Sequence, residues 1–477
     1  MSRDRRIEMR NNKPKKLIFE NIGRLGLLAG LIFSLFLTCV AQGPSLPSAG
    51  EAVAKIEEYM TAAERIDRFN GVILVARDGK PIVSRGYGMA NFEWEIPNSP
   101  KTAFRLGSIT KPFTAVAIML LQERGKLNVS DHVCKYVANC PTAWEAITIR
   151  HLLTHTSGIP NYTAFPGFIE KRGMMPISTN ELFAEYRSRP LDFPPGDRNS
   201  YSNSGYHLLG LVIEKASGKS YSDFLRENIF LPLGMKQSGY DSHRDLIKWR
   251  AAGYRREDDS YVNAPFMDML IPYSAGALYS TTGDLLIFDQ ALLGDRLLSQ
   301  RSRDEMFTPF KNNYALGWGV GKRFDRGATS HGGAINGFAS QFMRFPDENV
   351  TIVVLSNVQG SGVDKVANAL AAIMFGAKYD LPRERKAIAV ASSLLDNYTG
   401  EYQLLPTTVA VITNEGGKLF FKIDGQPKLE LFAETETDFF MKAVDAQVTF
   451  VKDEAGKVVR MQFRQGSGSG IPAPKIK

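Results

Sequence analysis

The chain has 477 residues, of which 44% are hydrophobic and 23% are charged. This length predicts two or three folded units, and this composition excludes a chain that is disordered as a whole. Residues 1–24 hold eight basic and three acidic side chains, so they account for +5 of the formal net charge of +8 and leave +3 for the rest. Without a basic stripe in the body of the chain, we expect no nucleic-acid partner.

Residues 1–43 are predicted to be a signal peptide or an N-terminal membrane anchor. Their basic head runs into an uncharged apolar stretch, residues 25–41, which ends at Ala41 before Gln-Gly-Pro. This order is typical of export signals, and the stretch is at the lower limit of a membrane span. A third reading makes Cys39 a lipidation site. We therefore expect an exported protein, periplasmic or on the outer face of the cytoplasmic membrane, with anchoring left open.

Export also bears on Cys134 and Cys140, which are six positions apart in VCKYVANCP. In an oxidising compartment they are candidates for a disulfide, and the alternative is two buried thiols. No His or Asp cluster at ligand spacing accompanies them, so we expect no metal site.

The pattern over 51–380 predicts one α+β domain. Helical spacing over 52–66 is followed by a hairpin pattern over 71–88, and then by an apolar helix that starts near Pro112. After a middle region of short helices and Pro/Gly loops, a second hairpin over 340–357 precedes another apolar helix. Strands at both ends of the domain predict an antiparallel sheet in which the first and last strands pair.

The periodicity changes to two from Tyr398 onward. Seven or so short strands, separated by turn clusters such as NEGG and DGQP, predict a small C-terminal β domain over 391–467. The charged stretch 380–386 is the predicted joint, and the Gly/Ser/Pro-rich residues 468–477 are predicted to be a flexible tail.

Ser108 and Lys111 lie in FRLGSITKPF, at the entrance of the apolar helix. Positions i and i+3 of a helix share a face, so the amine can reach the hydroxyl and activate it as a nucleophile. The helix entrance also supplies N–H groups for a developing oxyanion. Chance is the competing explanation, because S-x-x-K is short and serine is an ordinary helix cap.

Two further segments make a catalytic site the better interpretation. Tyr201 and Asn203 belong to YSN, where a Pro/Gly-rich loop meets an apolar helix. The phenol can serve as a general base or acid, and the carboxamide can contact both a substrate carbonyl and Lys111. A tyrosine packed under a loop, with Asn203 as a helix cap, is the structural alternative.

The second segment is His331-Gly332-Gly333, followed by Ala334. Glycines at the end of an edge strand allow a substrate backbone to approach closely, and the Ala334 N–H can face the Ser108 N–H. Alone, such a segment is more often a simple turn.

In this order the three segments resemble the signature of the serine β-lactamase and penicillin-binding-protein superfamily. The branch it resembles holds class C β-lactamases, D,D-carboxypeptidases, D-aminopeptidases and esterases. The stretches LLTHTSGIPNY and PGDRNSYSNSGYHLLG are also similar to that branch. The resemblance implies an antiparallel sheet flanked by helices, a helical subdomain, and a C-terminal lipocalin-like barrel.

The same resemblance implies that Ser108 is acylated, that Lys111 and Tyr201 share the proton transfers, and that Asn203 orients the scissile carbonyl. The amides of Ser108 and Ala334 would then hold the oxyanion. His331 departs from the pattern, because many members have lysine there. A histidine that is half charged near pH 6.5 holds a substrate carboxylate less firmly than lysine does. His155 and Ser157 are interpreted as a structural loop.

We therefore expect an exported serine hydrolase that acts on a small-molecule or peptide substrate, namely an ester, an amide, a D-amino peptide or a β-lactam. No cofactor is expected. One alternative is a true β-lactamase or D,D-carboxypeptidase, and another is a covalent penicillin-binding sensor without turnover. The sequence leaves the oligomeric state open.

Overall fold

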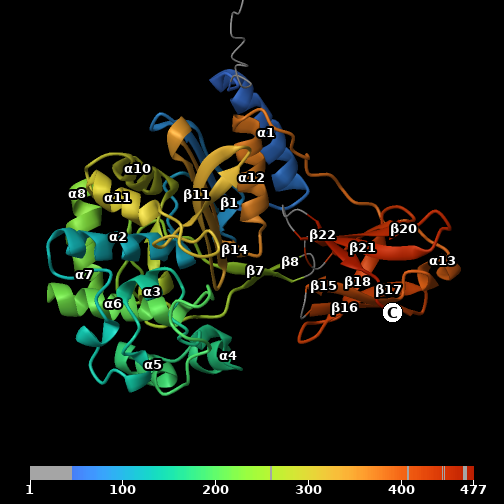
Figure 1. Ribbon diagram of the computed structural model, residues 1–477. Helices are drawn as coiled ribbons and strands as arrows, with labels where there is room; N and C mark the ends of the chain where they lie inside the picture. The colour runs from blue at the N-terminus through green and yellow to red at the C-terminus, as the bar shows by residue number, and fades with distance from the viewer. Residues whose placement is uncertain (1–45, 258–259, 406–407, 443, 445, 466–469) are drawn as a thin grey trace, which may run out of the picture. The chain divides into compact units, whose positions relative to one another are not determined.

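The computed structural model describes residues 46–477, apart from 258–259, 406–407, 443, 445 and 466–469 (Figure 1). The predicted signal or anchor segment, 1–43, lies outside these residues, as does Cys39. Among the helices of the described ranges, none is both long enough and apolar enough to cross a bilayer.

A six-stranded antiparallel sheet forms the centre of the first domain, as far as the chain is described, in the order β10-β11-β12-β13-β1-β2. Its strands are β1 (Gly71–Arg77), β2 (Lys80–Tyr87), β10 (Gly319–Arg323), β11 (Arg326–Ile335), β12 (Phe338–Phe345) and β13 (Val350–Ser356). Strand β1 pairs with β13, with Gly71 opposite Ser356 and Arg77 opposite Val350. The predicted pairing of strands from the two ends of this domain is confirmed.

Helices cover both faces of the sheet, and β1 shows why. Its side chains alternate, so that Val72 and Leu74 pack into one buried cluster while Ile73 and Val75 pack into another. The first cluster includes α2 (Thr110–Glu123) and α10 (Thr282–Leu293). The second includes α1 (Ala49–Arg65) and α12 (Val363–Met374), which lie side by side on the sheet in Figure 1. Strand β1, which lies between β13 and β2, is therefore apolar on both faces.

Further helices form the helical part of this domain. They are α3 (Ile149–Leu153), α4 (Phe168–Arg172), α5 (Thr179–Arg187), α6 (Asn203–Ser217), α7 (Tyr221–Leu225), the π-helical turn η5 (Arg226–Phe230), α8 (Leu231–Leu233), α9 (Tyr273–Gly276) and α11 (Gln300–Phe307). The 3₁₀ turns are η1 (Gly107–Ile109), η2 (Val133–Lys135), η3 (Thr142–Trp144), η4 (Tyr162–Ala164) and η6 (Pro346–Glu348). The short strands are β3 (Met89–Asn91), β4 (Ile96–Pro97), β5 (Phe104–Arg105), β6 (Gly239–Tyr240), β7 (Tyr254–Glu257), β8 (Ser260–Asn263), β9 (Leu278–Ser280) and β14 (Val358–Gln359).

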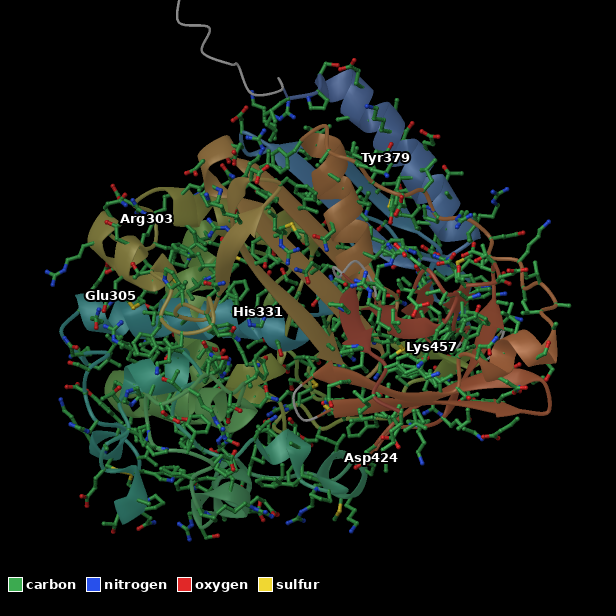
Figure 2. All side chains as sticks on the ribbon, turned by 45° about the vertical axis from the view of Figure 1, so that its right-hand side comes forward. Arg303, Glu305, His331, Tyr379, Asp424 and Lys457 are labelled. Carbon is green, nitrogen blue, oxygen red and sulfur yellow. A yellow bond between two sulfur atoms is a disulfide. The ribbon has the colours of Figure 1, made fainter. Side chains whose placement is uncertain are left out.

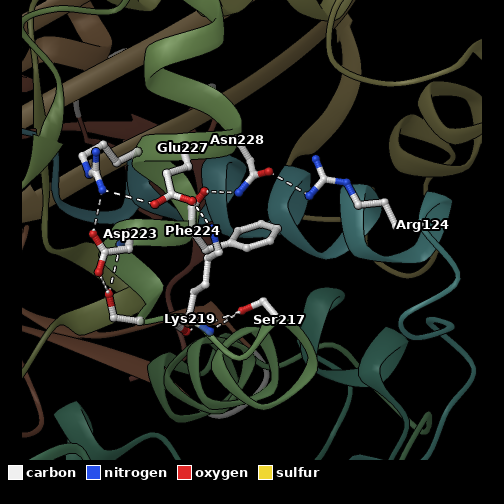
Figure 3. A network of polar contacts seen from close by, with 9 residues as sticks. Arg124, Ser217, Lys219, Asp223, Phe224, Glu227 and Asn228 are labelled. Carbon is white, nitrogen blue, oxygen red and sulfur yellow. Dashed lines mark hydrogen bonds and ion pairs between the residues drawn. The ribbon is translucent and has the colours of Figure 1, made fainter.

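Polar side chains connect α7 and η5 to the carboxyl end of α2 (Figure 3). Arg124 donates to Asn228 Oδ1 at 2.7 Å, and Asn228 Nδ2 donates to the Phe224 carbonyl at 2.7 Å. Lys219 pairs with Glu227 in the same network. Exposed pairs of this kind contribute about 0–1 kcal/mol each. The position of α2, on which the candidate nucleophile depends, therefore rests mainly on its buried apolar side chains.

The second domain is an eight-stranded antiparallel sheet in the described residues, with its strands in chain order. They are β15 (Gly400–Leu405), β16 (Thr408–Glu415), β17 (Lys418–Ile423), β18 (Leu429–Ala433), β19 (Asp438–Phe440), β20 (Ala446–Lys452), β21 (Val458–Gln465) and β22 (Ile471–Pro474), preceded by α13 (Ser392–Asp396). A bridge between Tyr402 and Lys475 brings the first and last strands together, so the sheet is a nearly closed barrel. The predicted lipocalin-like barrel is confirmed.

The prediction of a flexible tail over 468–477 is wrong for the described part of that segment. Strand β22 pairs with β21, and Ile476 N–H donates to the Glu401 carbonyl at 2.8 Å. Ala473 is fully buried in the core of this domain. The segment is rich in glycine and proline. It still forms an eighth strand, because it pairs with the edge of β21 and buries Ala473. Pro472 and Pro474 are tolerated because, in the described part of the chain, the backbone contacts with β15 begin only after them, at Lys475 and Ile476.

Candidate active site

Ser108 occupies the 3₁₀ turn η1, which leads directly into α2. Lys111 follows one turn later, and its Nζ lies 3.0 Å from Ser108 Oγ. The helix continues as a run of small and aliphatic side chains with no charged residue before Glu123, and nearly all of it is buried. Ser108 and Lys111 are therefore held on one face of a packed helix start, which is the arrangement the spacing predicted.

Lys111 is fully buried and has two further polar contacts. Its Nζ donates to Asn203 Oδ1 at 2.8 Å and to the Ala275 carbonyl at 2.9 Å. It also lies over the Tyr201 ring, 4.6 Å from the centroid. Burial lowers the pKa of the Lys111 amine well below its ordinary value. Because a carboxamide oxygen and a carbonyl can only accept, a neutral amine that donates to both keeps its lone pair for the Ser108 hydroxyl.

Tyr201 completes the arrangement from the other side. It stands on the loop before α6, whose N-cap is Ser202, and its hydroxyl donates to Ser108 Oγ at 2.8 Å. The residue is 40% exposed, so one side of it faces solvent. The hydroxyl end is still desolvated by the surrounding protein, and this burial raises the pKa of the phenol. Tyr201 is therefore a neutral proton donor in the resting site.

Asn203 connects Lys111 to the segment that contains Asn161 and Thr163. While its Oδ1 accepts from Lys111, its Nδ2 donates to Thr163 Oγ1 at 3.1 Å, and its backbone N–H donates to Asn161 Oδ1 at 3.0 Å. The alternative in which Asn203 is only a helix cap does not hold, because the N-cap of α6 is Ser202. Asn203 also lines the cavity in front of Ser108, which leaves its carboxamide within reach of a substrate.

Strand β11 passes directly beside η1, and two glycines permit this approach. A Cβ at Gly333 would lie 2.0 Å from the Leu106 carbonyl oxygen. A Cβ at Gly107, where φ is +53°, would lie 2.8 Å from the Ala334 nitrogen. The Ala334 amide therefore lies against the Gly107–Ser108 backbone, where the predicted oxyanion hole would form. Gly107 and Gly333 therefore allow β11 and η1 to pack closely against each other, in addition to any contact that they make with substrate.

We expected His331, Gly332 and Gly333 at the end of an edge strand. The structure agrees only in part, because β11 is an inner strand of the sheet. Strand β10 covers β11 from Arg326 to Ser330, and the pairing stops with Gly319 opposite Ser330. The segment from His331 onward has a β neighbour on one side only, namely β12. It is thus a local free edge on an inner strand of the sheet.

His331 does not act as the half-charged cation that the sequence analysis expected (Figure 2). Only 8% exposed, it directs Nδ1 to the Gly332 carbonyl at 2.6 Å and Nε2 to the Tyr314 hydroxyl at 3.0 Å. The carbonyl can only accept, so Nδ1 carries the proton and Nε2 accepts from the phenol. Burial, together with the nearby Lys111, lowers the pKa of His331 to about 3. The ring is neutral at physiological pH.

His155 lies behind Tyr201 and does more than shape a loop. Its φ is +56°, its Nδ1 accepts from the Ser202 N–H at 3.1 Å, and its carbonyl accepts from the Ser200 N–H at 2.8 Å. The imidazole centroid lies 4.3 Å from that of the Tyr201 ring and 4.8 Å from that of the Tyr314 ring. The HTSG turn therefore holds the loop that carries Tyr201, which explains why these two stretches occur together.

Sequence reasoning missed three members of this site: His155 as a contact of Tyr201, Tyr314 as the partner of His331, and the Ala275 carbonyl. Only the first offered a signal, since His155 lies in the stretch LLTHTSGIPNY, which resembles the family. The contact of Ala275 is made by a backbone atom and is therefore invisible in the sequence. Cys134 and Cys140 are joined in a disulfide. In the described ranges, His, Cys, Asp and Glu side chains form no group of three or more suited to a metal ion.

Comparisons with known proteins agree with this geometry. A family model described as Beta-lactamase matches residues 54–374, and one described as Domain of unknown function (DUF3471) matches residues 384–471. "Penicillin-binding protein 4*" of Bacillus subtilis (strain 168) is 33% identical over 431 residues, which cover 84% of this chain and 94% of that protein.

Solved structures show the same likeness. The octameric penicillin-binding protein homologue from Pyrococcus abyssi superimposes with a TM-score of 0.63 at 25% identity, covering 88% of this chain and 99% of that one. A D-stereospecific amidohydrolase from Streptomyces sp. superimposes with a TM-score of 0.57 at 26% identity, covering 70% and 100%. The similarity therefore includes both penicillin-binding and amide-hydrolysing proteins.

Proposed function

The chain belongs to the Beta-lactamase family and is a serine hydrolase of that type, and we propose that it cleaves esters and amides, including D-amino amides, through an acyl-enzyme on Ser108. One observation carries the proposal. Ser108 Oγ lies between a buried amine at 3.0 Å and a phenol at 2.8 Å. Burial lowers the pKa of the amine and so favours the form that can take a proton, while the phenol, whose pKa burial raises, can give one.

The first half of the reaction follows from these protonation states. Ser108 Oγ bonds to the acyl carbon while its proton moves to Lys111 Nζ, and the carbonyl electron pair collects on oxygen beside the amides of Ser108 and Ala334. When the carbonyl re-forms, the bond to the leaving group breaks, and that group takes the Tyr201 proton. Lys111, now an ammonium, supplies a proton to replace it.

The second half reverses these roles with water in place of the leaving group. Water bonds to the acyl carbon and loses a proton to the Lys111–Tyr201 pair, and the bond to Ser108 Oγ breaks as the serine recovers its proton. Asn203 holds Lys111 through its oxygen and can orient the acyl carbonyl through its amide. No step requires a group from outside the chain other than water.

The neutral state of His331 supports esters and amides over substrates that need a carboxylate anchor. A lysine at this place would offer a permanent cation, whereas an imidazole that donates to a carbonyl and accepts from Tyr314 has no free charge or donor. A β-lactam or a D-Ala-D-Ala peptide carries a carboxylate that would remain unpaired there. The 26% identical amidohydrolase structure lends further support to amide cleavage.

A true β-lactamase or D,D-carboxypeptidase is the second candidate, favoured by the 33% identical penicillin-binding relative. Turnover of nitrocefin, p-nitrophenyl acetate and a D-amino acid p-nitroanilide by one preparation separates the two. Our proposal expects the ester and the anilide to be hydrolysed, with kcat/KM for nitrocefin at least tenfold lower. Rapid nitrocefin hydrolysis with negligible esterase and amidase activity would refute this order. The Ser108→Ala variant controls for a contaminating hydrolase.

We also propose that the protein acts outside the cytoplasm. The disulfide between Cys134 and Cys140 supports this location, because such bonds persist in oxidising compartments. The basic and apolar pattern of residues 1–43 supports it as well. Fractionation of cells that express the full chain tests the proposal. Recovery in the cytoplasmic fraction with both thiols reduced would contradict it.

A further inference from the structure

The cavity in front of Ser108 is lined by apolar and neutral polar residues. It encloses about 270 Å³, and its apolar contributors include Tyr162, Ile169, Met267, Ile271 and Ile335. Its polar contributors are neutral side chains, among them Asn203 and Gln359. Of the described residues that line it, none has an ionisable acid or base other than the Tyr162 phenol. This wall can therefore solvate an apolar group, and it offers no cation to a carboxylate.

Four exposed apolar side chains lie close in sequence to residues that line this cavity. Met174, Met175, Phe266 and Leu270 are 55%, 51%, 51% and 38% exposed, and we call these four the apolar rim. Isolated exposed apolar residues are ordinary, but a group that adjoins a cavity marks a binding surface.

Backbone hydrogen bonds join the two segments of the apolar rim to each other and to the cavity wall. The Gly173 N–H donates to the Ile169 carbonyl at 2.8 Å, and the Asp268 N–H donates to the Gly173 carbonyl at 2.8 Å. The rim residues of the second segment flank Met267 and adjoin Ile271, which line the cavity. The segments that carry the rim are thus joined to segments that line the cavity.

The position of Tyr201 indicates which part of the substrate this surface receives. The leaving group must lie next to the Tyr201 hydroxyl, which protonates it, yet Tyr201 is not part of the cavity wall. Asn203 and Ala334, which face the acyl carbonyl, do belong to that wall. The cavity therefore lies on the acyl side of the scissile bond.

We propose that the substrate's acyl group carries a medium-length alkyl or aryl group and no carboxylate, and that this alkyl or aryl group fills the cavity and leaves it across the apolar rim. The inference rests on the proposed function and names the substrate class of that same site. A cation that could reach the mouth of the cavity is Arg255, which stands opposite Gln359 between β7 and β14, but its guanidinium pairs with Glu257 at 2.6 Å. An anionic acyl chain would therefore meet no cation among the residues that line the cavity.

A series of p-nitrophenyl esters from acetate to dodecanoate tests the inference, with p-nitrophenyl hemisuccinate as the charged counterpart of the butyrate. We expect kcat/KM to rise about fourfold per methylene up to hexanoate or octanoate, since each buried methylene is worth about 0.8 kcal/mol. The hemisuccinate should react at least tenfold more slowly than the butyrate.

Variants assign the effect to the rim. Phe266→Ser combined with Leu270→Ser should lower the octanoate-to-acetate ratio of kcat/KM at least fivefold. Leu231→Ser is the matched control, because Leu231 is 63% exposed on α8, outside the rim, and it should leave the ratio unchanged. Esterase activity that is indifferent to chain length, or faster with the hemisuccinate, would overturn this inference and leave the proposed function standing. Absence of turnover and of acylation with every ester would overturn both.

Discussion

Replacement of His155 by asparagine isolates what the imidazole ring does for Tyr201. Asparagine tolerates the φ of +56° at this position, and its Oδ1 can take the place of Nδ1 as acceptor for the Ser202 N–H. What disappears is the ring, which packs on Tyr201, Tyr206 and Tyr314. At about 0.5–1.5 kcal/mol for each aromatic pair, the folded state should lose about 2–4 kcal/mol.

The effect on catalysis should exceed a simple loss of stability. Without the ring behind it, Tyr201 can shift relative to Ser108 Oγ, and a displacement near 1 Å can cost about a hundredfold in rate. We expect kcat for an ester to fall about 10- to 100-fold while KM changes by less than about threefold, because His155 does not line the substrate cavity. Steady-state kinetics at 25 °C and calorimetric unfolding measure the two effects.

Phe345→Leu is the control for destabilisation alone. Phe345 is fully buried in the cluster on the opposite face of the sheet, 4.6 Å from the Phe375 ring between centroids. This variant should lose stability and keep its kcat. The reasoning is refuted if His155→Asn retains kcat within twofold, or if Phe345→Leu loses as much activity at an equal loss of stability.

Three further predictions concern protons and charges. As pH falls, kcat/KM should decrease because Lys111 gains a proton and ceases to be a base. A pH–rate profile of His331→Gln should show the same decrease at low pH. The reason is that His331, with a pKa of about 3, stays neutral over this range and does not cause the decrease. Tyr201→Phe should lower kcat about 10²- to 10⁴-fold in stopped-flow or steady-state assays, with little change in unfolding temperature. Arg344→Met should lower the free energy of unfolding, measured with denaturant, by about 3–5 kcal/mol, because it leaves the buried Asp289 carboxylate without its ion-pair partner. The double variant with Asp289→Asn should recover part of that loss.

The residues that could be predicted from the sequence are those whose chemistry depends on local spacing. Ser108 and Lys111 share one helical turn, and Tyr201 and Asn203 flank a helix start, so each pair is positioned by its own element. The two apolar runs of residues 71–88 likewise predicted the hairpin that β1 and β2 form. In each case the nearest neighbours along the chain decide the geometry.

What could not be predicted depends on contacts between distant segments. The pKa of His331 is lowered by its burial and by Lys111, which belongs to α2, far away in the sequence. The requirement for glycine at position 333 comes from the Leu106 carbonyl. The strand β22 was missed because its Gly/Pro-rich composition conceals a single buried alanine, which only the closing of the barrel makes relevant.

Intact-mass spectrometry of the protein during turnover tests the central claim most directly. Incubation with a slowly deacylating p-nitrophenyl ester or D-amino acid amide, followed by acid quench, should give a mass increase equal to one acyl group. Peptide mapping should place that group on Ser108, and Ser108→Ala should show no increase. An adduct on another residue, an adduct that persists in Ser108→Ala, or turnover with no covalent species at any time after mixing would contradict the account.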